Sequence, residues 1–396
     1  MEIWKGKGGK AVRARRNIGI MYAIALLQGM VFYGPIATLY REAAGVTIFQ
    51  ITLIESISMA LGLLLELPWG AVADRIGYRR TMIFCCMLYL VSKVVFWRAE
   101  GFGMFLIERV LLSVVCAGLS GVEEAVLYLS ADEGQSQRCF GIWNSLGQAG
   151  LMAAAVVYSV FVGENYRLAG LLTVLSYGLA AVLSLGIVEV RPEERRSSMH
   201  PVRDFGSALR GLVRTPGLLL LVLSMALLAE THQTITVFLC QKQYEMCGMR
   251  GAGYGAVYLL LTLAGMVGGL SQRCTRRLGE MRFGMLCALA AALASLTLAL
   301  TRNLLLSVAA VLLLRLGWML CAPLYVRLEN ERVAGENRAT ELSVNALLRD
   351  GVAVLTNLVF GRLAEQALGL AMGLGALLSL CAMALLAAFF KRTARS

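Results

Sequence analysis

The chain has 396 residues, of which 58% are hydrophobic and only 16% charged, and its mean hydropathy is +0.70. This composition excludes a soluble globular domain and indicates a polytopic membrane protein. The net charge of +12 does not indicate a nucleic-acid partner, because the basic residues gather in the segments that separate long apolar runs.

Twelve apolar runs are long enough to cross a membrane, since a spanning helix needs roughly 20 predominantly apolar residues. The first run follows a basic arm and is too long for the core of a signal peptide, so we interpret it as a true span. The runs cover residues 18–40, 49–69, 81–97, 104–126, 140–161, 168–189, 216–239, 253–271, 283–301, 304–326, 342–361 and 367–390. They predict an all-α membrane protein with twelve transmembrane helices.

The distribution of basic residues predicts the orientation. With the N-terminus inside, the cytoplasmic segments hold 26 of the 37 Lys and Arg residues and the external segments hold 7. Such an excess marks the cytoplasmic side, so both termini are predicted to be cytoplasmic. Short loops, and the absence of any Asn-x-Ser/Thr sequon, favour the cytoplasmic (inner) membrane of a bacterium.

The stretch Gly70–Arg80, GAVADRIGYRR, separates the second and third runs. It resembles the loop between helices 2 and 3 of the major facilitator superfamily of secondary transporters, whose signature is G-x-x-x-D-R-x-G-R-R. The positions that carry the resemblance are Gly70, Asp74, Arg75, Gly77, Arg79 and Arg80. The resemblance implies a fold of two pseudo-symmetric six-helix bundles that works by alternating access.

The resemblance also implies a gating role for this loop. Asp74 is expected to hold the two bundles together against the start of helix 11, where a helix N-terminus favours an anion. Arg75 and Arg79 are expected to reach Asp132 or Glu133 in the loop between helices 4 and 5. The alternative is a solvated, positively charged turn with no gating role.

Residues 190–215 form the most polar internal stretch. We interpret it as a cytoplasmic linker between an N-terminal six-helix half, residues 1–189, and a C-terminal half, residues 216–396. Aligning Gly77 with Gly279 gives an offset of 279 − 77 = 202, which predicts a two-fold internal repeat. The same offset places Gln28 opposite Glu230 and Gln148 opposite Asp350. The second copy of the loop has lost its signature and reads TRRLGEMR, with Arg276 in place of Asp74.

Two further segments resemble the superfamily. Arg338–Thr340 resembles the R-A-T segment before helix 11, and Glu108–Leu112 resembles the arginine motif of helix 4. The run at 140–161 lacks the G-x-x-x-G-P motif of proton-drug antiporters, which leaves the direction of transport open.

Ionisable residues near the middle of a span are costly, so they normally face a cavity or a partner. Glu230 and Asp350 are the candidates for proton coupling, because desolvation favours the protonated form of a carboxyl group. The alternative is a static ion pair, either Asp350 with Arg315 or Glu230 with Arg349. His232 is a third candidate for proton transfer, although its helical face differs from that of Glu230.

A substrate cavity is predicted from polar residues in both halves. Arg315 and Trp318, one helical turn apart, form a charged and aromatic wall in the C-terminal half. The N-terminal half contributes neutral groups, namely Tyr33 together with Gln28, Asn144 and Gln148. Lys93 and Glu108 have similar depth on neighbouring runs, which favours a structural ion pair.

These features predict a secondary transporter that exports a small amphipathic compound or drug by proton coupling, and not an enzyme. Proton-coupled import of a sugar or organic acid is the alternative, and a non-transporting sensor or scaffold is the alternative of another class. No phosphate-binding loop supports ATP use, and the ten cysteines and two histidines lack metal-ligand spacing. No cofactor or metal is expected, and the expected partners are the substrate, protons and the lipid bilayer around a monomer.

Overall fold

The computed structural model describes the backbone of residues 2–131, 134–190, 216–333 and 338–393. Within these ranges, the side chains of residues 2–14, 66–68, 70, 71, 73, 74, 216 and 338–340 are not described. All regular structure in the described ranges is helical, and twelve helical segments are long and apolar enough to cross a membrane. The predicted all-α fold with twelve spans is confirmed. Nearly all of the predicted linker lies outside the described residues.

The chain divides into two compact units. Unit 1 comprises Met1–Val46, Ser58–Arg196 and Gly251–Leu259, and unit 2 comprises Thr47–Ile57, Ser197–Arg250 and Leu260–Ser396. Two helices contribute to both units. Helix α3 (Ile48–Ile76) begins in unit 2 and ends in unit 1, whereas α12 (Ala252–Ala264) begins in unit 1 and ends in unit 2.

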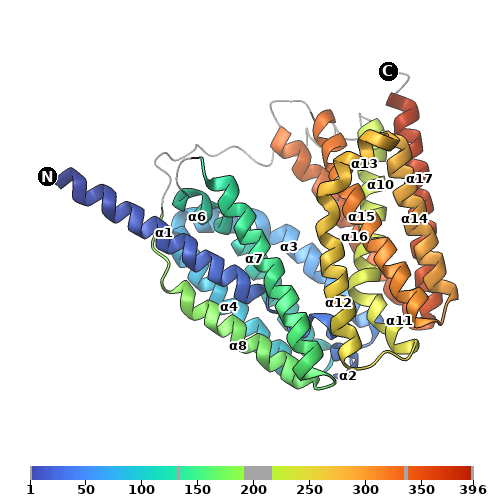
Figure 1. The fold of residues 1–396 in the computed structure, drawn as a ribbon, viewed down its shortest axis with the longest axis horizontal. Coiled ribbons are helices and arrows are strands. Elements are labelled where there is room, and N and C mark those ends of the chain that lie inside the picture. The colour runs from blue at the N-terminus through green and yellow to red at the C-terminus, as the bar shows by residue number, and fades with distance from the viewer. Residues whose placement is uncertain (1, 132–133, 191–215, 334–337, 394–396) are drawn as a thin grey trace. The chain divides into compact units, whose positions relative to one another are not determined.

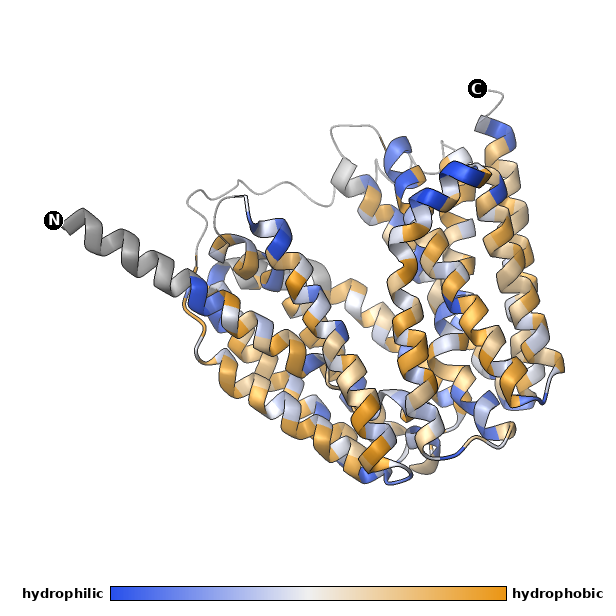
Figure 2. Ribbon diagram, viewed as in Figure 1, coloured by the Kyte–Doolittle hydropathy of each residue, from blue (hydrophilic) through white to orange (hydrophobic). Residues whose placement is uncertain are grey.

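Unit 1 is drawn mainly from blue to green in Figure 1. Apolar residues cover its spans, and charged residues gather at the helix ends (Figure 2). Besides the larger part of α3, its elements are α1 (Glu2–Gly29), the 3-10 turn η1 (Gly34–Ile36), α2 (Ala37–Ala43), α4 (Tyr78–Arg98), α5 (Gly101–Leu119), α6 (Val122–Ser130), α7 (Ser136–Val157), the π-helical turn η2 (Tyr158–Val162) and α8 (Tyr166–Ser184).

The first span is interrupted, which corrects the prediction of one continuous helix over residues 18–40. Helix α1 ends at Gly29, and the 3-10 turn η1 lies between it and α2. The interruption contains Gly34 and Pro35, which favour a break because glycine is conformationally free and proline lacks a backbone N–H group. Tyr33 therefore does not share a continuous helical face with residues of α1.

Helices α1 and α7 approach so closely that two positions require glycine. A Cβ atom on Gly29 would lie 2.3 Å from the carbonyl oxygen of Gly147. A Cβ atom on Gly150 would lie 2.2 Å from the carbonyl oxygen of Leu26. Because these obstacles are backbone atoms, no side-chain rotation relieves the contact.

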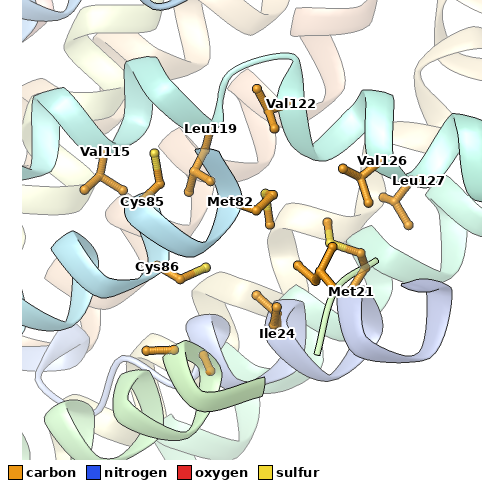
Figure 3. Packing of buried hydrophobic residues seen from close by; sticks show 13 residues of the cluster. Met21, Ile24, Met82, Cys85, Cys86, Val115, Leu119, Val122, Val126 and Leu127 are labelled. Carbon is orange, nitrogen blue, oxygen red and sulfur yellow. The ribbon is translucent and has the colours of Figure 1, made fainter. Parts of the chain in front are cut away.

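The core of unit 1 is packed from thirteen buried apolar residues of α1, α4, α5, α6 and α8 and the segment after α8. Figure 3 shows Met21 and Ile24 of α1 close to Met82 of α4, with Val126 and Leu127 of α6 beyond them. In a lipid environment, van der Waals contacts between these closely packed side chains hold the helices together within the unit.

Unit 2 is drawn mainly from yellow-green to red in Figure 1. Its elements are the start of α3, the end of α12, α10 (Pro216–Gln233), the π-helical turn η3 (Thr234–Leu239), α11 (Cys240–Met246), the 3-10 segment η4 (Gly265–Leu270), α13 (Ser271–Leu278), α14 (Glu280–Leu300), α15 (Leu304–Arg332), α16 (Arg338–Gln366) and α17 (Leu368–Thr393).

Close helix packing and buried hydroxyl groups hold unit 2 together. A Cβ atom on Gly284 of α14 would lie 2.6 Å from Leu386 of α17. Ser224 of α10 donates to the carbonyl oxygen of Ala382 of α17 at 2.7 Å and lies 2.7 Å from the Tyr325 hydroxyl of α15. In a lipid environment such contacts substitute for the hydrophobic effect between helices.

The predicted offset of 202 residues recurs in the helix boundaries. Helix α4 covers residues 78–98 and α14 covers 280–300, so both ends differ by 202 (280 − 78 and 300 − 98). Helices α8 and α17 begin at 166 and 368, which again differ by 202. The two-fold repeat inferred from Gly77 and Gly279 is therefore confirmed at the level of helix placement.

Candidate transport site

Glu230 lies at the centre of the polar interior of unit 2. Its side chain projects from α10 and is only 4% exposed. Thr234 Oγ1 lies 2.6 Å from Glu230 Oε1 and 3.0 Å from Oδ1 of Asn357 on α16, which is 1% exposed. Glu230 forms no ion pair within the described part of the chain, so the partners of this buried carboxyl group are neutral.

The backbone changes where this cluster is built. Thr234 is the first residue of the π-helical turn η3, which continues the span that α10 begins. π-helical turns are rare and are often found at functional sites. The π-helical turn is not visible in the sequence pattern, because residues 216–239 form one uninterrupted apolar run.

Two more acids lie near Glu230. Glu55 of α3 and Asp350 of α16, both half-buried, are close enough to interact with Glu230 electrostatically. The structure thus brings both predicted coupling acids, Glu230 and Asp350, to one part of unit 2.

His232 lies with Arg315 and Trp318. Arg315 Nη1 is 3.2 Å from His232 Nε2, and the rings of His232 and Trp318 stack with centroids 6.0 Å apart and an interplanar angle of 25°. A guanidinium group can only donate, so Nε2 is the acceptor and the imidazole is neutral, with its proton on Nδ1. Arg315 also fills the space beside Gly265, where a Cβ atom would lie 2.9 Å from Nη2.

A charged cluster that the sequence did not predict ties α15 to α16. Glu329 is 4% exposed, and its two carboxylate oxygens accept from Arg349 Nη1 at 2.8 and 3.0 Å. Asn345 also donates to Glu329 Oε1, at 2.9 Å. The predicted alternative of a static Glu230–Arg349 pair is therefore wrong, because Arg349 pairs with Glu329.

Unit 1 contains a second buried charged cluster. The Lys93 ammonium group lies 3.9 Å from Glu108 Oε1, which confirms the predicted pair, and it donates to the Tyr33 hydroxyl at 3.0 Å. The rings of Tyr89 and Tyr177 face the same ammonium group, with centroids 4.9 and 5.2 Å away. Tyr33 is thus a partner of a buried lysine and is itself only 6% exposed.

The other predicted cavity residues of unit 1 lie on two helices. Gln28 of α1 is half-buried, and its side-chain amide donates to Cys86 Sγ at 3.7 Å. The backbone carbonyl oxygen of Gln28 accepts a hydrogen bond from the Tyr177 hydroxyl at 2.6 Å. Asn144 and Gln148 are exposed one turn apart on α7, as predicted. The amides of α7 are therefore available to a ligand, whereas Gln28 already has protein partners.

A family model of the Major Facilitator Superfamily matches residues 18–357. The chain belongs to the major facilitator superfamily. It is therefore a multi-pass membrane protein of a family of transporters, and its substrate is a small molecule. No curated protein sequence matches it.

Solved structures of superfamily members share the fold. A point mutant of the nucleoside transporter NupG has a TM-score of 0.80 at 13% identity, covering 94% of this chain and 100% of that one. The POT family transporter PepTSo has a TM-score of 0.70 at 13% identity, covering 95% of this chain and 98% of that one. A bacterial homologue of the lysosomal transporter Spinster has a TM-score of 0.65 at 16% identity, covering 96% and 94%. Identities this low show a common fold and leave the substrate open.

The signature loop of this superfamily member is a tight turn between α3 and α4. Gly77 has a φ of 96°, which favours glycine, and the backbone N–H group of Tyr78 donates to Glu189 Oε1 at 3.1 Å. Arg79 Nε donates to the carbonyl oxygen of Ile187 at 2.7 Å.

Only some of the residues expected to make the gating contacts of this loop have described side chains. The side chains of Arg75 and Arg80 are exposed. The side chain of Asp74, and all of Asp132 and Glu133, lie outside the described residues, and Gly70 is described only as part of the α3 backbone. The gating role of the loop therefore stays a prediction.

Proposed function

We propose that this transporter is a proton-coupled exporter of small amphipathic compounds and that Glu230 carries the proton. It acts as a monomer in the bacterial inner membrane, with both termini in the cytoplasm, and has no enzymatic activity. The observation that supports proton coupling is the arrangement of Glu230, Thr234 and Asn357, which can satisfy the hydrogen bonds of either protonation state.

When Glu230 is protonated, its carboxyl group donates to Thr234, and Thr234 donates to Asn357. A hydroxyl group has a single proton, so Thr234 cannot donate to Glu230 and Asn357 at once. If Thr234 donates to Asn357 Oδ1 at 3.0 Å, its 2.6 Å contact with Glu230 needs a proton on the carboxyl group. A neutral carboxylic acid is also the form that burial favours.

In the deprotonated state the same atoms reverse their roles. Thr234 then donates to the Glu230 carboxylate, and Asn357 turns its amide group so that its nitrogen donates to Thr234. Only two rotations, of a hydroxyl and of an amide group, separate the two states. Glu230 and Thr234 therefore keep their hydrogen bond in both protonation states, as suits a residue that gains and loses a proton.

Groups suited to an amphipathic ligand are present in each unit. In unit 2, Trp318 offers an aromatic face beside the guanidinium group of Arg315. In unit 1, Asn144 and Gln148 offer exposed amide groups. These are the residues we propose for substrate binding. For His232 we propose that it orients Arg315, a role that its hydrogen bond with this arginine supports.

The direction of transport is the part of this proposal that a pH-gradient assay decides. Gly70–Arg80 resembles the superfamily as a whole, so the loop supports a transporter and favours neither direction. The missing glycine-proline motif in α7 leaves export and import of a small nutrient as alternatives. In liposomes with an inward-directed or outward-directed pH gradient, an exporter moves the ligand against the proton flow and an importer moves it with the proton flow.

The ligand must first be found by thermal shift, because a compound that binds the folded state raises its apparent stability. Glu230→Gln is then compared with wild type in two assays, accumulation driven by a pH gradient and ligand exchange without a gradient. We expect the variant to lose accumulation and to keep exchange, since exchange needs no net proton movement.

Glu245→Gln is the matched control, because Glu245 is an exposed acid that pairs with Lys242 on the surface. We expect it to behave like wild type in both assays. Full gradient-driven accumulation by Glu230→Gln would contradict the assignment of the proton site. If no stabilising ligand moves across the membrane at all, the protein is a sensor or scaffold.

A further inference from the structure

Four exposed arginines surround the turn between α13 and α14 in unit 2. Arg273, Arg276 and Arg277 follow an i, i+3, i+4 spacing, so they lie on one face of α13, and Arg282 lies in the first turn of α14. Within the described part of the chain, none of the four forms an ion pair or a hydrogen bond.

Glu280, the acid at the start of α14, forms an ion pair with a residue outside this group of arginines. Glu280 pairs with Arg327 of α15, which also donates to Glu331 at 2.9 Å. Among the described residues, the four arginines, which we call the arginine patch, therefore have no acidic partner. Figure 2 shows hydrophilic residues gathered at this end of α13 and α14.

The corresponding turn of unit 1, at Gly77, differs because it has a carboxylate as a partner. Gly77 and Gly279 have nearly the same backbone, with φ and ψ of 96° and 149° in one and 79° and 151° in the other. In unit 1, the Glu189 carboxylate accepts from the backbone of the residue after the glycine. The residue 202 positions after Glu189 is Lys391, which is exposed (391 − 189 = 202). Unit 2 therefore keeps the backbone of the turn, and the sequence position that corresponds to the anion of unit 1 holds a cation.

Exposed apolar side chains accompany the patch. Leu270, Leu278 and Met281 are 47%, 44% and 37% exposed on the same segment. A soluble anion needs only the charges, whereas a phospholipid presents a negative headgroup and apolar chains together. The combination of unpaired arginines and exposed apolar residues at the end of a membrane span matches the lipid.

We propose that the arginine patch binds the phosphodiester groups of anionic phospholipids. The planar guanidinium group suits phosphate oxygens, and each basic residue at an anionic membrane surface contributes about 1 kcal/mol. The patch lies at the end of unit 2 that the distribution of basic residues predicts to be cytoplasmic. This lipid site is independent of the proton site at Glu230.

The test uses the full-length protein in phosphatidylcholine nanodiscs that contain a rising fraction of phosphatidylglycerol. The phosphatidylglycerol retained by the protein is counted by native mass spectrometry. We expect the triple variant Arg276→Gln, Arg277→Gln, Arg282→Gln to retain it with an affinity about fivefold lower for each arginine removed. Its thermal unfolding in pure phosphatidylcholine should match wild type, because these arginines have no protein partner within the described residues.

The matched control removes Arg250 and Arg302, two exposed arginines near the opposite end of α14, about 31 Å away for a helix of this length. Replacing both by glutamine should leave retention unchanged. Equal retention by the triple variant and wild type would overturn the proposal, as would an equal loss in the control. Displacement of all bound phosphatidylglycerol by an equal concentration of inorganic phosphate would also overturn it, because the site would then recognise a free anion.

Discussion

At the scale of single residues, buried charges in this transporter are held by partners from neighbouring helices. Lys93 is held by Glu108 and by the Tyr33 hydroxyl, and Glu329 by Arg349 and Asn345. Taking such a charge out of water is costly, and the cost is offset only when the hydrogen bonds are made. Glu230 differs, because its hydrogen-bond partner Thr234 is neutral, and we propose that this partner serves both protonation states.

Removing one member of the Lys93–Glu108 pair should therefore destabilise unit 1. Lys93→Met leaves the Glu108 carboxyl group buried without its cation, and we expect the free energy of unfolding to fall by about 3–5 kcal/mol. Denaturant unfolding in mixed micelles measures the change. The double variant Lys93→Met, Glu108→Leu should recover most of the loss. A Lys93→Met protein as stable as wild type would show that the pair contributes nothing.

The positions of charged residues within apolar runs predicted some of these buried charges. Glu230, Asp350 and the Lys93–Glu108 pair were found because each interrupts an apolar run. Glu329 was missed, because the predicted run ended at residue 326 and Glu329 resembled a loop charge. Helix α15 continues to Arg332, which places Glu329 inside the packed helix.

At the scale of elements, close backbone contacts and helix interruptions position the residues proposed for transport. Glycines set the approach of α1 to α7, the helix that carries Asn144 and Gln148. The π-helical turn η3 follows Glu230 on the same span. Apolar length predicted all twelve spans, but it did not predict the interruptions, because a π-helical or 3-10 turn has the same apolar composition as an α-helix.

Gly150→Ala tests the glycine contact between α1 and α7. The added Cβ atom would lie 2.2 Å from a backbone oxygen, so we expect the helices to separate and the free energy of unfolding to fall by about 1–3 kcal/mol. Gly141→Ala on the same helix is the control, since it is exposed and a Cβ atom there meets nothing within 4 Å. The control should gain up to about 1 kcal/mol from helix propensity. Equal effects at both positions would contradict the close contact.

At the scale of the whole molecule, two copies of one turn have diverged. The backbone at Gly77 and Gly279 is nearly the same, but the turn in unit 1 binds Glu189, whereas the exposed arginines of the turn in unit 2 have no partner among the described residues. The sequence offset of 202 predicted this repeat. It did not predict which arginines of the second copy have a partner among the described residues, because paired and solvent-exposed arginines are identical in sequence.

The divergence predicts that only the first turn acts in gating. Asp74→Asn removes a charge but no ligand contact, so we expect the turnover rate to fall while ligand affinity changes little. Flux in liposomes and ligand-dependent thermal stabilisation measure the two quantities separately. A large loss of affinity with normal turnover would contradict the gating assignment.

The central claim is that Glu230 gains and loses one proton in each transport cycle. The most direct measurement records internal pH with a trapped dye while a gradient of the identified ligand drives transport in liposomes. Wild-type protein is predicted to move protons opposite to the ligand, whereas Glu230→Gln is predicted to move the ligand by exchange without any pH change. Proton movement by Glu230→Gln at the wild-type ratio to ligand would contradict the claim.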